Sequence, residues 1–211
     1  MKLKIYGTHH LLEKEKIVAV LESFNPDVVC VELDEIRFKK LKGEEIDESY
    51  LKQISWFSKF MITKIKKKSE KIAEDSEQEY GGDMISALQY CGDNNIPVKL
   101  IDMGIVETSK GFDKLNWGEK VLFWGGIEFG KATLEQVNNL DEEKVRVRQE
   151  ELETKFPNLY EHLVVGRDKF MANKIAEVVL LNKYERVLVF VGKGHVVGIK
   201  SILDDKGIDV E

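Results

Sequence analysis

Cysteine is scarce in this 211-residue chain, and its spacing excludes two common kinds of site. The two thiols, Cys30 and Cys91, lie far apart and form no C-x-x-C pair of the kind that binds zinc or exchanges disulfides. Cys30 falls within an apolar run and Cys91 at a predicted helix end, so we interpret both as buried thiols. Such cysteine usage is typical of a protein kept in a reducing cytoplasm.

The chain also lacks long apolar runs and an excess of positive charge. No stretch reaches the roughly 18–20 apolar residues that cross a bilayer, and the opening MKLKIYGTHH shows no secretory signal. The 38 acidic residues outnumber the 32 basic ones, which gives a formal net charge of −6. Because binding to phosphates needs a positive field, we expect no nucleic-acid partner. We likewise expect no membrane association and a cytoplasmic location.

Short apolar runs, rich in β-branched residues, alternate along the chain with stretches of helical spacing. Each run is four or five residues long, which favours buried strands of a parallel sheet. Leu11–Phe24 carries apolar residues at helical spacing between the first two runs, so the chain opens with a β-α-β unit. We therefore predict an α/β fold with a mainly parallel central sheet flanked by helices. The predicted strands are Leu3–Tyr6, Val28–Glu32, Val98–Ile101 and Val187–Val191.

A long helical insertion is predicted after the second strand. From Asp47 to Glu79 apolar residues recur at helical spacing, and Gly81-Gly82 then break the pattern. Asp83 is placed to cap the helix that follows. We therefore assign residues 1–211 to one domain that contains a helical insertion at about 44–80.

Part of this insertion, Trp56–Lys68, combines apolar and basic residues (WFSKFMITKIKKK). A helix lying on a membrane surface is one interpretation of that pattern. We prefer a helix buried against the domain or against a second copy in a homodimer, because apolar helix stripes usually pack on protein. The side chains expected to be buried are Leu51, Ile54, Phe57 and Met61.

A third helical block, residues 119–182, contains one proline, Pro157, which should start its last helix. His162 lies in a charged stretch of this block, and we interpret it as a solvated side chain.

Polar residues follow several of the predicted strands directly. Since the carboxyl ends of parallel strands meet at one edge of a sheet, where ligands usually bind, we expect these residues to converge. His10 and His195 share a G-x-x-H frame, although a single histidine beside a glycine turn is more often a capping residue. The turn Gly192–Gly194 is no phosphate loop, because the Walker pattern is absent. The polar sets are Gly7-Thr8-His9-His10, Glu32–Arg37, Asp102 and Gly192-Lys193-Gly194-His195.

Glu32 extends the apolar run Val28–Val31 and therefore needs a compensating partner. Burying an unpaired carboxylate costs several kcal/mol, roughly, so a cation, a metal ion or hydrogen-bond donors must face it. Arg37 and Arg167 are the candidate partners. A purely structural pair between Glu32 and one of these arginines is the alternative to a functional carboxylate.

Four blocks of the sequence resemble the TraB/PrgY family. GTHHLLEKEKIVAVLESFNPDVVCVELDEIR is similar to the opening of that family, a GT-x-H turn followed by a PDVV-x-VELD-x-x-R strand. GGDM at 81–84, GRDKFMANKI at 166–175 and VLVFVGKGHVVGI at 187–199 resemble its later motifs in the correct order. The resemblance covers nearly the whole chain.

The resemblance implies a fold and a site. The family is distantly related to the Tiki proteases, the erythromycin esterases and the haem-binding ChaN proteins, which implies an α/β fold with a histidine- and glutamate-lined cleft. Tiki-like members are regarded as metal-dependent proteases and TraB/PrgY proteins as inhibitors of peptide pheromone signalling, whereas the erythromycin esterases suggest hydrolysis without metal. The positions that match the motifs are His10, Glu32, Arg37, Arg167, Asp168 and His195.

This sequence departs from the family pattern at several positions. Asp83 replaces a glutamate, and Gly166 stands where a glutamate usually precedes Arg167. Met103 and Gly104 stand where an arginine and an acid are expected. These departures bear on catalytic competence rather than on the fold.

The leading hypothesis is a metal-dependent hydrolase of peptide or amide bonds that acts on a peptide or small-molecule substrate, including signalling peptides. Imidazole and carboxylate ligands suit a divalent ion such as Mn, Co or Zn. Glu32 could also serve as the base, with Arg37 orienting it, Arg167 stabilising developing negative charge and Asp168 as a further catalytic position. The predicted metal ligands are His10, Glu32, Asp83 and His195.

The alternative is a protein without catalytic activity that sequesters a peptide or small molecule in the same cleft. The loss of the arginine and the acid at Met103 and Gly104 favours this alternative.

Overall fold

A four-stranded, fully parallel sheet forms the centre of the structure, a computed structural model that describes residues 1–8, 14–75, 81–122, 142–181 and 183–211. Its order is β1-β4-β2-β3, so β4 lies between β1 and β2. Phe190 of β4 is opposite Tyr6 on one side and Val31 on the other. The strands are β1 (Lys2–Thr8), β2 (Val28–Val31), β3 (Val98–Leu100) and β4 (Arg186–Gly192). They overlap the four predicted runs, with ends that differ by at most two residues, and the α/β prediction is confirmed.

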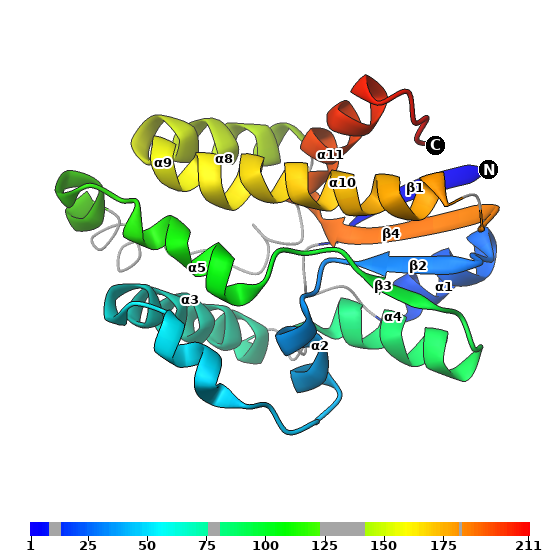
Figure 1. Cartoon of the computed structure of the whole chain (residues 1–211), viewed down its shortest axis with the longest axis horizontal. Coiled ribbons are helices and arrows are strands. Elements are labelled where there is room, and N and C mark those ends of the chain that lie inside the picture. Colours follow the sequence, from blue (N-terminus) through cyan, green and yellow to red (C-terminus); the bar gives the residue numbers. More distant parts are fainter. Residues whose placement is uncertain (9–13, 76–80, 123–141, 182) are drawn as a thin grey trace.

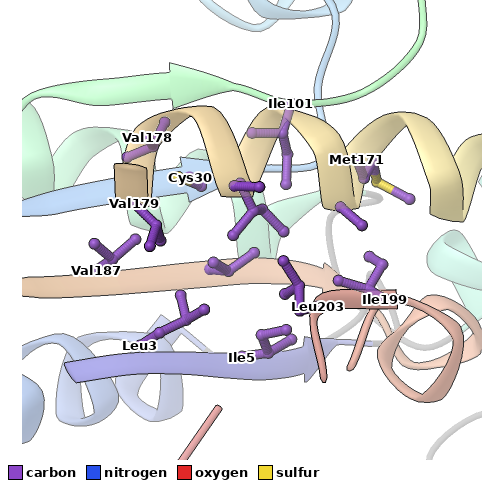
Figure 2. Packing of buried hydrophobic residues seen from close by; sticks show 14 of the residues in the cluster. Leu3, Ile5, Cys30, Ile101, Met171, Val178, Val179, Val187, Ile199 and Leu203 are labelled. Carbon is purple, nitrogen blue, oxygen red and sulfur yellow. The ribbon is translucent and has the colours of Figure 1, made fainter. Parts of the chain in front are cut away.

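Helices cover both faces of this sheet (Figure 1). The helices α1 (Lys14–Phe24) and α4 (Gly82–Asp93) share one core cluster with Leu188 and Phe190 of β4. The helices α10 (Gly166–Leu180) and α11 (Lys193–Asp205) share the other with Val187, Val189 and Val191. Alternate residues of one buried strand thus face opposite layers, as the pleat requires. Figure 2 shows Met171, Val178 and Val179 of α10 packed toward this second cluster.

The remaining helices gather beyond the carboxyl ends of the strands (Figure 1). The elements are α2 (Glu35–Leu41), η1 (Glu48–Gln53), α3 (Trp56–Asp75), α5 (Ile105–Asp113), α8 (Glu142–Lys155), α9 (Pro157–Tyr160) and η2 (Glu161–Val165). The helices α3, α5, α8, α9 and the turn η2 contribute to a third apolar cluster that contains Met61, Phe112, Leu115, Phe156 and Leu159, whereas Phe38 and Leu41 of α2 pack against the cluster of α1 and α4.

The apolar stripe of the predicted insertion packs within the chain. Ile54 and Met61 are buried, and Leu51 and Phe57 are partly buried. Met61 and Phe57 belong to the third cluster, where α3 meets α5. No described helix is long and apolar enough to cross a membrane. Formation of a homodimer stays a prediction.

Local differences from the predicted elements arise at glycines. The helix α4 begins at Gly82 after Gly81, which has φ = 80° as its N-cap, so Asp83 lies in the first turn rather than at the cap. A positive φ favours glycine because a Cβ would be strained there. The predicted turn over Gly192–Gly194 is also wrong, because β4 runs to Gly192 and α11 begins at Lys193.

Candidate functional site

Glu32 follows β2 at the carboxyl edge of the sheet, where its side chain is 6% exposed. Its amide donates to the Phe190 carbonyl at 3.0 Å, so the residue is held against β4. The carboxylate Oε2 accepts a hydrogen bond of 2.5 Å from the Gly192 amide, and Oε1 accepts one from Arg167. Hydrogen bonds from a backbone amide and a guanidinium therefore compensate the buried charge that the sequence places here.

Arg167 lies in the first turn of α10 and is the cation of this site. Its Nε donates to Asp102 Oδ1 at 3.0 Å and its Nη2 to Asp102 Oδ2 at 2.7 Å, while Nη2 also bonds Glu32. Burial opposes the charge of Arg167, but attraction to Glu32 and Asp102 outweighs it and raises the guanidinium pKa. Arg167 therefore stays charged and links the ends of β2 and β3.

Asp102, which we expected to lie at this edge but to which we gave no role, is the residue that connects the two arginines. It follows β3 and is buried, and both Arg167 and Arg37 bond its carboxylate. Arg37 in turn donates from Nε to Asp34 Oδ2 at 3.1 Å. Arg37 is thus connected to Glu32 through a chain of hydrogen bonds that passes through Asp102 and Arg167. We had expected Arg37 to orient Glu32 directly. The available signal was an acidic residue placed directly after a strand.

Asp168 and His195 form a close pair on the other side of Arg167. His195 Nδ1 lies 2.5 Å from Asp168 Oδ1, and Arg167 Nη1 lies 3.1 Å from His195 Nε2. Because a guanidinium can only donate, Nε2 must accept and Nδ1 must carry the proton. Burial raises the pKa of the Asp168 carboxyl, although the pairing with His195 opposes the shift. The imidazole is thereby fixed in one tautomer and one orientation.

Gly198 of α11 provides the space that Asp168 occupies. A Cβ on Gly198 would lie 2.0 Å from Asp168 Oδ2 and 2.8 Å from its Cγ. The helix α11 therefore presents bare backbone to this carboxylate, which lets α10 and α11 approach closely around the Asp168–His195 pair.

Buried carboxylates and guanidiniums alternate in the site. Glu32, Asp34, Asp102 and Asp168 are each less than 9% exposed. Arg37 bonds Asp34 and Asp102, and Arg167 bonds Asp102 and Glu32. Each guanidinium is thus shared between two carboxylates, which offsets the cost of burying these charges.

Two of the four predicted metal ligands lie together. Glu32 Oε1 and His195 Nε2 are 3.6 Å apart, a separation that two atoms can have when each binds one ion at about 2.0–2.2 Å. Arg167 contacts both of these atoms, so its guanidinium lies where an ion would compete with it. The two atoms are of the types that bind divalent ions, and Arg167 contacts both of them.

The other two predicted ligands are not placed in this pair. Asp83 is buried in the first turn of α4, where its Oδ1 accepts from the Met84 amide at 2.8 Å. His10 lies outside the described residues. Within the described ranges no group of three or more His, Cys, Asp and Glu side chains is arranged to hold a metal ion. Binding of one metal ion by His10, Glu32, Asp83 and His195 together stays a prediction.

His162, which we expected to be solvated, is buried. It is 9% exposed and belongs to η2, the π turn that directly precedes α10. The expectation was wrong because the charged neighbours of His162 in sequence point away from it, toward solvent. Glu161, for example, pairs with Lys169 on the surface.

Comparisons with known proteins support the resemblance seen in the motifs. Residues 127–211 match the model of the TraB/PrgY/gumN family, a range that includes Arg167, Asp168 and His195. The chain is also 31% identical over 221 residues to the uncharacterised protein MJ1365 of Methanocaldococcus jannaschii. That alignment covers 98% of this chain and 55% of the relative, so the chain spans about half the length of the curated relative that it matches.

Proposed function

We propose that this chain, which belongs to the TraB/PrgY/gumN family, hydrolyses peptide or amide bonds at the carboxyl edge of its sheet. The observation that carries the proposal is the arrangement of His195 between Asp168 and Glu32. Asp168 holds Nδ1 at 2.5 Å, and Nε2 lies 3.6 Å from Glu32 Oε1. The lone pair of Nε2 and the carboxylate oxygen therefore lie side by side against Arg167, and they could take up and return protons once a substrate or water replaces that contact.

Asp168 and Glu32 would have different tasks in this proposal. Asp168 orients His195 and stabilises the imidazolium that forms when Nε2 takes up a proton. Glu32 is fixed by the Gly192 amide and Arg167, so its oxygen stays beside Nε2 without the cost of reorientation.

The two arginines would bind the oxygen atoms of the substrate. Arg167 adjoins both Glu32 and His195 and can stabilise negative charge that develops on a carbonyl oxygen next to them. The side chain of Arg37 is 33% exposed and that of Arg167 is 14% exposed. Arg37 is therefore the more accessible of the two and can bind a carboxylate or carbonyl group of a peptide.

Glu32 and His195 would also hold a divalent ion such as Mn, Co or Zn, as their spacing and their donor atoms suggest. Such an ion would act as a Lewis acid toward the carbonyl and lower the pKa of water. Arg167, which bonds both Glu32 and His195 here, would keep its two hydrogen bonds to Asp102 if an ion were bound. His10 and Asp83 are the further ligands that we propose.

The test combines metal analysis with peptide cleavage. Protein purified without an affinity tag is treated with a chelator and assayed on a peptide library, first alone and then with each ion. We expect cleavage by the wild type to rise on addition of an ion and to be lost in His195→Asn and Glu32→Gln. The exposed pair Glu143–Arg146 of α8 offers a matched control, so Glu143→Gln should cleave like the wild type. Cleavage that survives in His195→Asn would contradict the proposal.

Sequestration of a peptide without catalysis is the second candidate, and one observation favours it. Arg167 already bonds Asp102, Glu32 and His195, so most of its donors are occupied. A protein of this kind would bind library peptides and release them uncut, with binding weakened in Arg37→Gln. Mass spectrometry of the recovered peptides separates the two functions.

A further inference from the structure

The π turn η2 (Glu161–Val165) sets the direction from which α10 approaches the site. Arg167 and Asp168 are consecutive residues in the first turn of α10, yet they contact different partners. Arg167 bonds Glu32 and Asp102, and Asp168 bonds His195. A π turn shifts the helical register of the residues that follow it, and such turns are frequent at functional sites. A change in η2 would therefore rotate both side chains together.

His162 is the side chain that joins η2 to α5. Its Nε2 lies 2.8 Å from the carbonyl oxygen of Glu107, so Nε2 carries a proton and donates it. Nδ1 then accepts from the Lys114 ammonium group at 3.1 Å. Glu107 is in α5 and Lys114 is its C-cap residue, so one imidazole contacts both ends of that helix.

The surface of α5 is shaped for this ring. A Cβ on Gly111 would lie 2.6 Å from His162 Cδ2 and 3.2 Å from its Cγ. Only glycine leaves room for the imidazole at that distance. The close fit and the two hydrogen bonds hold η2 at one position on α5.

The residues that lead into the start of α5 belong to the site. The chain runs from Asp102, the partner of Arg167 and Arg37, through Met103 into α5. The carbonyl oxygen of Met103 accepts from Arg37 Nη2 at 3.3 Å and from the hydroxyl of Thr108 at 3.3 Å. The segment that leads into α5 thus contains Asp102, and α5 itself holds the turn that leads to Arg167.

We infer that His162 is a positioning residue: by fixing η2 on α5 it sets the directions of Arg167 and Asp168, and through Asp168 the tautomer of His195. The inference rests on the proposed function only in treating His195 as a functional group. Its test reads the imidazole directly and does not depend on activity.

The experiment uses NMR of the full chain labelled with 15N-histidine at mildly alkaline pH, with His195 assigned by the signals lost in His195→Asn. The wild type should show His195 in the Nδ1–H form. His162→Phe keeps a ring at position 162 but loses both of its hydrogen bonds. In this variant we expect His195 to show a mixture of the two tautomers in place of the single Nδ1–H form. His162→Gln keeps an amide that can donate to the Glu107 carbonyl, and it should restore the single form. Val178→Ala removes buried volume from α10 away from η2 and should leave His195 unchanged.

Several results would overturn the inference. His195 in the Nε2–H form in the wild type is one, and an unchanged single form in folded His162→Phe is another. If Val178→Ala showed the same mixture of His195 tautomers as His162→Phe, the effect would come from a general loss of packing and not from η2. If His162→Phe does not fold, Gly111→Ala displaces the ring and keeps both partners, and unchanged His195 signals in that variant would also overturn it. Absence of hydrolysis together with the expected spectra would count against the proposed function alone.

Discussion

Glu32→Gln perturbs the best-defined contact of the site, and its effect on stability can be worked out from the structure. Glu32 accepts from two donors, the Gly192 amide and Arg167 Nη2, and is 6% exposed. The two donors bond different oxygen atoms of Glu32, and glutamine replaces one of these oxygens with an NH2 group that cannot accept, so one donor loses its partner. An unsatisfied buried donor costs about 1–3 kcal/mol. Arg167 keeps two bonds to Asp102, which holds the loss below the roughly 3–5 kcal/mol of a fully broken buried pair.

The assay is thermal unfolding in the presence of a chelator, which removes any stabilisation by bound ions. For a domain of this size each kcal/mol lowers the melting temperature by roughly 2–4 °C, so Glu32→Gln should lower it by roughly 2–12 °C. Arg167→Met leaves the carboxylates of Glu32 and Asp102 without their cation and should cost more, about 3–5 kcal/mol. The exposed control Glu143→Gln should change stability by less than about 0.5 kcal/mol. A larger loss in Glu32→Gln than in Arg167→Met would refute the reasoning.

Further predictions concern the buried polar groups and the helical cluster. Burial raises the pKa of Asp168 above 3.8, so its ionisation destabilises the folded state increasingly as pH rises through the raised pKa. Asp168→Asn should therefore melt higher than the wild type at neutral pH, with the difference vanishing in acid; an equal difference at every pH would contradict this. Burial raises the pKa of Cys30 to about 12 and that of Cys91 to about 11. A thiol reagent should therefore modify both cysteines only after denaturation. Rapid modification of the native protein would contradict this prediction. Met61→Ala should cost about 2–5 kcal/mol in urea unfolding, because Met61 is 1% exposed in the third cluster, whereas a loss below about 1 kcal/mol would show that the cluster is loosely packed.

The sheet could be predicted from the sequence because its strands are short, buried and β-branched. Buried parallel strands read as continuous apolar runs, and Val28–Val31 is fully buried on both faces. Glu32 and His195 could be singled out for the same reason, since each follows such a run. Parallel strands bring their carboxyl ends to one edge whatever their separation along the chain.

The rest of the site depends on helix directions, which local patterns do not encode. Arg167 and Asp168 follow no strand. Arg167 could be named only as one possible partner of Glu32, and Asp168 was indicated by the resemblance to a family alone. The π turn before them has no signature in the sequence, so the burial of His162 could not be foreseen. Asp102 was visible after β3 but was given no role, because its two arginine partners come from distant elements.

Cleavage of a peptide library in water enriched in 18O is the most direct test of the central claim. Hydrolysis places one oxygen atom of the solvent in each newly formed carboxyl group, so mass spectrometry identifies both the cut site and the reaction. We predict 18O-labelled products with the wild type and with Glu143→Gln, and none with Glu32→Gln or His195→Asn. Labelled products of equal yield from His195→Asn, or an uncut library with the ion-loaded wild type, would contradict the proposed hydrolysis.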